Sequence, residues 1–131
     1  MKSLILLTAL LCAVVLSTSA GVASKASAPA KKQKAVTMFN DPVRLMGVTL
    51  KGEYLFVHDD AAMARGEACT FVYKGDAEIQ SKLVVSFHCT PAQRLKVGSF
   101  VVRTELINGF NELKEYQFEG DTEAHMVPLG K

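Results

Sequence analysis

Short apolar runs separated by turn residues predict strands through most of the chain, and no long window shows a convincing helical period. The runs are rich in Val, Phe, Tyr and Thr, and Gly, Asn, Asp or Pro lie between them. Only the segment DDAAMARGEA favours a turn or two of helix, which Gly66 would end. The predicted strands are 43–50, 53–58, 68–74, 83–89, 99–107 and 113–120, with a short last strand at 124–129, and turns at Lys51-Gly52 and Asn108-Gly109.

These elements predict an all-β domain, a small antiparallel β-sandwich or partly open barrel of about six or seven strands. One predicted hairpin, ACTFVYK with LVVSFHC, brings two cysteines together. Side chains alternate across a strand, so the apolar positions set which residues share a face. The matching register pairs Phe71 with Phe87, Tyr73 with Val85 and Cys69 with Cys89 on the core face, and it turns His88 to the other face.

The first twenty residues predict export. Lys2 precedes an unbroken apolar run over 4–16, and Thr18-Ser19-Ala20 supplies small residues for cleavage after Ala20. The run is shorter than the roughly 20 residues of a membrane span, although an uncleaved anchor is the alternative. Residues 1–20 therefore indicate a signal peptide, and the protein is expected to be periplasmic or secreted in a bacterium. No later run is long enough for a transmembrane segment.

Residues 21–37 are mostly Ala, Ser, Lys and Pro, which predicts a disordered leader before a single β domain at 38–131. The chain has 15 Lys and Arg against 13 Asp and Glu. Five of the basic residues and no acidic ones precede Met38, so the domain carries 10 basic residues against 13 acidic ones. An acidic domain disfavours nucleic-acid binding, which needs a basic face. The lysines of the leader form a solubilising tail or touch an anionic envelope surface.

Two cysteines in an exported domain most often form a disulfide, because the compartment is oxidising. A Cys69–Cys89 bridge would close a loop of about twenty residues and stabilise the fold by roughly 3 kcal/mol. The leading interpretation is an exported, non-catalytic β domain without a cofactor, which binds an unknown protein or envelope component. Its candidate partner surfaces are an unpaired edge strand and a loop that contains Asp59, Asp60, Met63 and Arg65.

The alternative interpretation is a copper or zinc protein, because thiolates and imidazoles are ligands for both metals. Met63 and Met126 add soft sulfur atoms. No C-x-x-C or H-x-x-x-H pair exists, and the Cys-His-Met order of blue copper sites is missing. The candidate ligands are His58, Cys69, His88, Cys89 and His125.

Catalysis is not predicted. A reactive cysteine needs a base within reach, and His88 on a strand would point away from Cys89. The chain has no Gly-rich phosphate loop and no Trp for stacking on sugars. We therefore expect a protein that is not an enzyme.

The sequence also resembles a group of small exported bacterial proteins without an assigned function. The pieces that carry this resemblance are GVTLKGEYLFVHDD, ARGEACTFVY, VVSFHC, LKEYQFEG and HMVP, and they span residues 43–128. The most specific are VHDDAAMARGEACT and SFHC. The resemblance implies an exported β domain with no established ligand, and it draws attention to the same cysteines and histidines.

Overall fold

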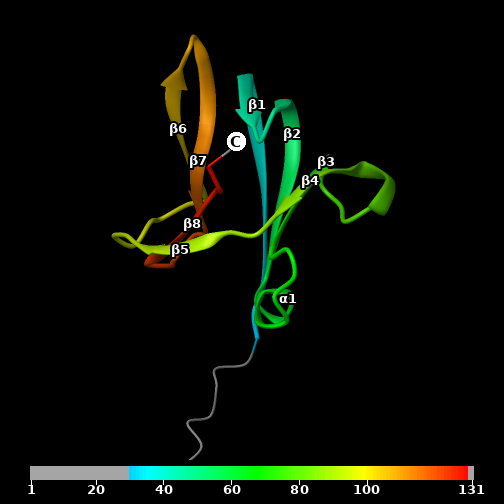
Figure 1. Cartoon of the computed structure of the whole chain (residues 1–131), viewed down its shortest axis with the longest axis vertical. Helices are drawn as coiled ribbons and strands as arrows, with labels where there is room; N and C mark the ends of the chain where they lie inside the picture. Colours follow the sequence, from blue (N-terminus) through cyan, green and yellow to red (C-terminus); the bar gives the residue numbers. More distant parts are fainter. Residues whose placement is uncertain (1–29, 130–131) are drawn as a thin grey trace, which may run out of the picture.

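The computed structural model describes residues 30–129 and shows a curled, open sheet that forms a half-barrel (Figure 1). The sheet order is β4-β3-β2-β1-β7-β8-β5, and β6 pairs with β7. The predicted all-β class is confirmed. The elements are β1 (Lys32–Leu45), β2 (Val48–Asp59), α1 (Asp60–Ala64), β3 (Thr70–Lys74), the 3-10 helix η1 (Gln80–Lys82), β4 (Leu83–Phe87), β5 (Thr90–Gln93), β6 (Val101–Ile107), β7 (Phe110–Gln117) and β8 (Glu123–Met126).

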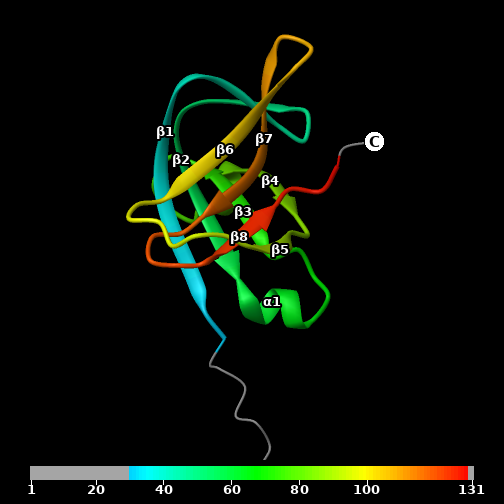
Figure 2. The ribbon, with the colours of Figure 1, turned by 90° about the vertical axis from the view of Figure 1, so that its left-hand side faces the viewer.

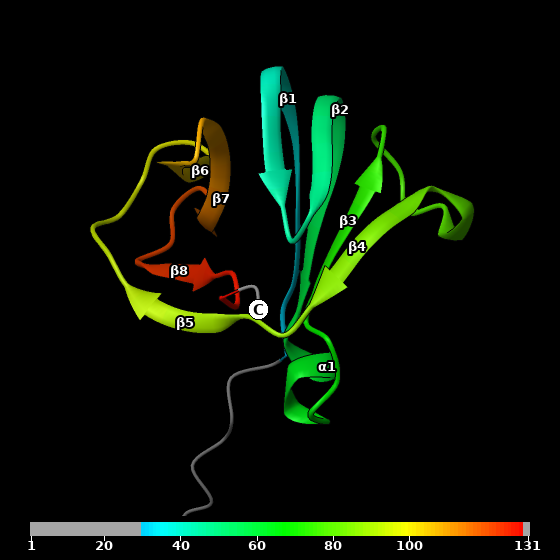
Figure 3. The ribbon, with the colours of Figure 1, turned by 45° about the horizontal axis from the view of Figure 1, so that its top comes forward.

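The curl follows from the link between β4 and β5. These two strands lie at opposite ends of the sheet order, yet only His88 and Cys89 separate them in the chain. The chain thus passes from the β1–β4 side of the sheet to the β5–β8 side at this point (Figure 3). The two sides also meet through β1 and β7, which pair in parallel at Arg44 and Glu112. A main apolar core that includes Phe56, Val72 and Tyr116 fills the inside of the curl.

The first hairpin differs from its prediction. The segment 43–50 is not one strand, because Met46 and Gly47 form a two-residue turn between β1 and β2 with φ of 49° and 83°. Positive φ at both central residues matches the right-handed twist of paired strands. Lys51-Gly52, predicted as a turn, lies inside β2. The predicted turn at Asn108-Gly109 does join two strands, β6 and β7, with φ of 50° and 81°.

The strand β1 corrects the predicted boundary of the leader. Residues 32–37 belong to β1 and pair with β2, from Lys32 opposite Asp59 to Thr37 opposite Tyr54. Alternate side chains face solvent there, namely Lys32, Lys34 and Val36, and the two lysines form ion pairs with Glu78. A low apolar content therefore did not prevent strand formation, since the long β2 supplies a backbone partner. The predicted signal peptide and residues 21–29 lie outside the described part of the chain.

The β3–β4 register also differs by one residue from the prediction. Thr70 lies opposite Phe87, and Phe71 lies opposite Ser86. Phe71 and Tyr73, predicted on the core face, pack on the outer face of the sheet with Leu55 and Val57, because both faces of this strand carry apolar side chains. A bulge between Val72 and Tyr73 shifts the observed register again, so that Tyr73 lies opposite Leu83 and not opposite Val85 as predicted.

The predicted helix is confirmed as α1, at the lower end of the sheet beside the start of β1 (Figure 2). Asp59 caps it, because its Oδ1 accepts hydrogen bonds from the amides of Ala61 and Ala62 at 3.0 and 3.2 Å. Gly66, with φ of 75°, follows its end as predicted. Between residues 30 and 129, no helix has both the length and the apolar character needed to cross a membrane.

Candidate metal centre

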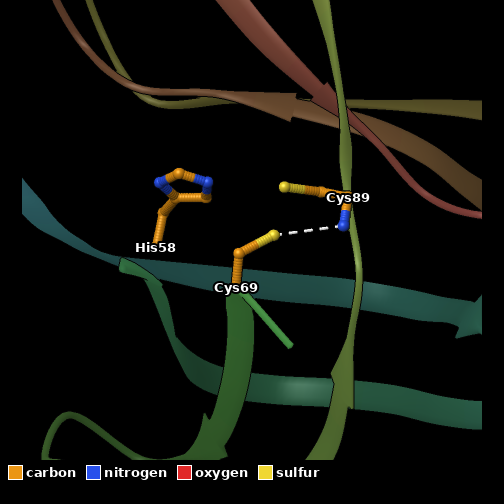
Figure 4. Close-up of side chains that lie close together, drawn as sticks. All are labelled: His58, Cys69 and Cys89. Atoms are coloured by element: carbon orange, nitrogen blue, oxygen red, sulfur yellow. Dashed lines mark hydrogen bonds between the residues drawn. The ribbon is translucent and has the colours of Figure 1, made fainter. Parts of the chain in front are cut away.

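His58, Cys69 and Cys89 converge in the buried lower part of the half-barrel. His58 is near the end of β2, Cys69 directly precedes β3, and Cys89 lies in the β4–β5 link. One ligand atom of each lies within 4.8 Å of the others, and all three residues are buried. Figure 4 shows one ring nitrogen of His58 facing the two sulfur atoms, while the other points away from them. Three segments far apart in the sequence thus present two thiols and an imidazole to one point.

Backbone hydrogen bonds hold these segments together. The amide of Cys69 donates to the carbonyl of Phe87 at 3.1 Å, and the amide of Asp59 donates to the carbonyl of Cys69 at 2.9 Å. The amide of Cys89 donates to Cys69 Sγ at 3.1 Å. The kink after β4 therefore uses a cysteine sulfur as an acceptor, which places Cys89 against Cys69.

His125, on β8, completes a cluster of four potential ligands. Its ring stacks on the ring of His58 with centroids 4.0 Å apart and planes at 29°. Its Nδ1 lies 3.7 Å from Cys89 Sγ. On its other side, the ring lies 5.0 Å from that of Tyr116, whose hydroxyl is hydrogen-bonded to Thr70. We call His58, Cys69, Cys89 and His125 the Cys/His cluster.

Three ring nitrogens of the cluster lack hydrogen-bond partners among the described residues. They are Nδ1 and Nε2 of His58 and Nε2 of His125. The side chain of His58 is 1% exposed, and its Nδ1 lies 3.2 Å from Asp60 Oδ1 without the geometry of a hydrogen bond. Leaving a buried polar atom unpaired costs roughly 1–3 kcal/mol, so orphaned nitrogens at one point need an explanation.

The protonation states follow from burial. Burial lowers the pKa of His58, against the opposite effect of Asp60. Burial, and next the adjacent His58, lower the pKa of His125 to about 4. Burial, and then the hydrogen bond with Cys69, raise the pKa of Cys89 to about 12. Both imidazoles are thus neutral at pH 7, the form that binds metals, whereas Cys89 would lose a proton to become a ligand.

The structure brings together four of the five candidate ligands predicted from the sequence. His88 is exposed on the other side of the strand, as its alternation with Cys89 predicts. Cys69 and Cys89 both lie in the main core, as predicted, although the register differs. Both are free thiols in the structure, so their disulfide stays a prediction. Met63 and Met126, the predicted soft ligands, are 37% and 40% exposed and lie outside the buried cluster.

The predicted partner loop has mixed roles. Asp59 caps α1, and Asp60 lies against His58. Arg65 forms an exposed ion pair with Glu67 at 3.0 Å, and Met63 is partly exposed. Partner binding by this loop stays a prediction. Sequence reasoning missed Tyr116 and Thr70, which are contacts of the cluster that no local motif indicates.

Comparisons of the chain with protein-family models, curated proteins and solved structures found no match. The cluster must therefore be interpreted from its own chemistry.

Proposed function

We propose that the protein binds a soft transition-metal ion, Zn(II) or Cu(I), in the Cys/His cluster. The observation that supports this most is the convergence of two thiols and two imidazoles in the core, where three ring nitrogens have no hydrogen-bond partner. Thiolate and imidazole ligands are the set that zinc and copper prefer. A bound ion would satisfy His58 Nε2, the unpaired nitrogen that faces the two sulfur atoms.

The distances fit this proposal after a small contraction. Ligands about 2.0–2.3 Å from a tetrahedral zinc ion lie roughly 3.3–3.8 Å from one another. The ligand atoms of His58, Cys69 and Cys89 lie within 4.8 Å of one another, and His125 Nδ1 is already 3.7 Å from Cys89 Sγ. Side-chain movements of about 1 Å would bring the four ligand atoms to the distances of a tetrahedral site. Four chain segments would then be joined at the point where the sheet curls.

The proximity of the sulfurs also supports a second candidate, a disulfide-stapled binding module exported from a bacterial cell. Cys69 and Cys89 lie close enough that oxidation would bridge them with little rearrangement. The two candidates exclude each other in one molecule, because a bridged pair offers no thiolates. Thiol alkylation followed by intact mass, without and with prior reduction, separates them. Cysteines that are blocked until reduction support the staple, and cysteines that react directly support a dithiol site.

Titration of the reduced, metal-free protein with Co(II), followed by displacement with Zn(II), tests metal binding. We expect one ion per chain, an intense near-ultraviolet thiolate-to-metal band, and release of about two protons as the thiols ionise. His58→Ala should weaken binding by at least about tenfold. His88→Ala is the matched control, because this exposed histidine is adjacent to Cys89 and should change affinity less than about twofold. Absence of a thiolate band in the unmodified protein would overturn the proposal.

A further inference from the structure

A polar pocket lies beside His58. Its volume is about 280 Å³, and its lining residues come from the start of β1, the start of α1 and the segment that leads into β8. Three of the lining side chains are carboxylates and one is a lysine, so the pocket is acidic. We call it the acidic pocket. Its lining residues are Lys31, Gln33, Asp60, Asp121, Thr122 and Glu123.

The acidic pocket meets the Cys/His cluster where Asp60 contacts His58. Asp60 lines the pocket, and its Oδ1 lies 3.2 Å from His58 Nδ1. Nδ1 therefore points towards the pocket, and it is one of the orphaned nitrogens of a side chain that is 1% exposed. The other ring nitrogen faces the two cysteine sulfurs (Figure 4). His58 thus lies between Asp60, which lines the pocket, and the two thiols, with one ring nitrogen towards each.

The carboxylates of the pocket differ in how firmly they are held. Asp121 accepts a hydrogen bond from Gln33 Nε2 at 2.8 Å and lies 4.0 Å from Lys31 Nζ. Asp60 Oδ2 accepts from the backbone amide of Lys31 at 3.1 Å. Glu123 forms no hydrogen bond or ion pair through its side chain within the described residues. The pocket therefore has two hydrogen-bonded carboxylates next to a free one. Its three carboxylates outnumber its single lysine.

From this arrangement we propose that the acidic pocket is the route by which a metal cation reaches the buried cluster. This inference rests on the proposed metal binding. Clustered carboxylates attract a cation and raise its local concentration. Oxygen ligands hold soft ions more weakly than thiolate and imidazole do, so the ion would move inward to the cysteines. His58, with a nitrogen on either side, is the residue past which the ion would move.

The test measures how fast Co(II) enters the reduced, metal-free chain, by stopped-flow absorbance of the thiolate band at low ionic strength. The variants are Glu123→Gln and the double change Asp121→Asn with Glu123→Gln. None of these residues is a proposed ligand, so the final spectrum should be unchanged. We expect the association rate to fall about three- to tenfold in the double variant and less in the single one, and the salt dependence to weaken.

Glu105→Gln is the matched control, because it removes one carboxylate from the exposed side of β6, outside the acidic pocket. Its association rate should stay within about twofold of the unmodified chain. A normal thiolate band with equal rates in all variants would overturn the route and leave metal binding intact. No band in the unmodified chain would overturn metal binding and the route together.

Discussion

Two polar clusters flank β7, one buried and one partly exposed, and they differ in how well their atoms are paired. Tyr116 faces inward to the Cys/His cluster, where it stacks on His125. Its neighbours Glu115 and Gln117 lie on the other face of the strand, next to two arginines. We call this second group, Arg94, Arg103, Glu115 and Gln117, the Arg/Glu cluster.

In the Arg/Glu cluster, every charged or amide group has a partner. Glu115 accepts from Arg94 Nη2 at 2.7 Å and from Arg103 Nη1 at 3.0 Å. The side chain of Gln117 accepts from Arg103 and donates to the carbonyls of Leu95 and Asp121 at 2.9 and 2.7 Å. A fully satisfied network fixes the packing of β6, β7 and the segment after β5.

The Cys/His cluster has the opposite character, since three of its ring nitrogens are unpaired. A purely structural buried cluster would be expected to pair its polar atoms as fully as Glu115 and Gln117, the buried members of the Arg/Glu cluster, do. Sites that break the usual rules of packing and pairing tend to be functional. This difference in pairing is what the proposed metal binding by the Cys/His cluster, and a stabilising role of the Arg/Glu cluster, would lead us to expect.

The largest expected effect is the stabilisation of the fold by metal. A ligand at 100 times its dissociation constant stabilises the native state by about 2.7 kcal/mol. For a domain of this size, the midpoint of thermal unfolding should rise by roughly 10–20 °C. Calorimetry of the reduced chain with and without Zn(II) measures the shift. The double change Cys69→Ser with Cys89→Ser should abolish it, whereas Glu115→Gln should keep it, and an equal shift in the double variant would show that zinc binds elsewhere.

The next effect should come from the Arg/Glu cluster. Glu115→Gln removes the negative charge and one of the two oxygens that accept hydrogen bonds from Arg94 and Arg103, and it should lower the free energy of unfolding by about 1–2 kcal/mol. The partly exposed guanidinium groups keep this below the loss expected for a fully buried pair. Urea denaturation in excess EDTA measures it, and Glu105→Gln on the exposed side of β6 is the matched control. No loss would mean that this cluster is not a stabilising network.

The contribution of Glu115 to the free energy of unfolding should depend on pH. Arg94 holds the pKa of Glu115 below its usual value of 4.5, with Arg103 adding to the effect against the opposing effect of burial. A lowered folded-state pKa gives stability that is complete above the unfolded-state pKa and lost as the pH falls through the folded-state value. The difference between the unmodified chain and Glu115→Gln should therefore be constant above about pH 5.5 and shrink steadily below pH 4.5. Urea denaturation between pH 7 and 3 measures this change. A difference that persists at the lowest pH would assign the effect to packing instead of charge.

The sequence predicted the composition of the Cys/His cluster better than its geometry. Cys69 and Cys89 lie in the core and His88 lies outside, as predicted, but the prediction that Phe71 and Tyr73 share the face of Cys69 was wrong. The β3–β4 register could not be derived, because Phe71 is apolar yet packs on the outer face with Leu55 and Val57. The convergence of His58 with His125 depends on the β7–β8 pairing and on the curl of the sheet. Such long-range contacts leave no periodic pattern in the chain.

The smallest expected effect is that of His58→Leu in metal-free protein, and Gln117→Leu in the Arg/Glu cluster is the change to compare it with. Gln117→Leu leaves two backbone carbonyls and Arg103 without their partner and should cost about 1–3 kcal/mol. His58→Leu removes two unpaired nitrogens together with a stacked ring, so its free energy of unfolding should change by less than about 1 kcal/mol in either direction. Urea denaturation in excess EDTA measures both. If His58→Leu cost as much as Gln117→Leu, His58 would contribute to stability without metal, and the two clusters would not differ in the way that their pairing indicates.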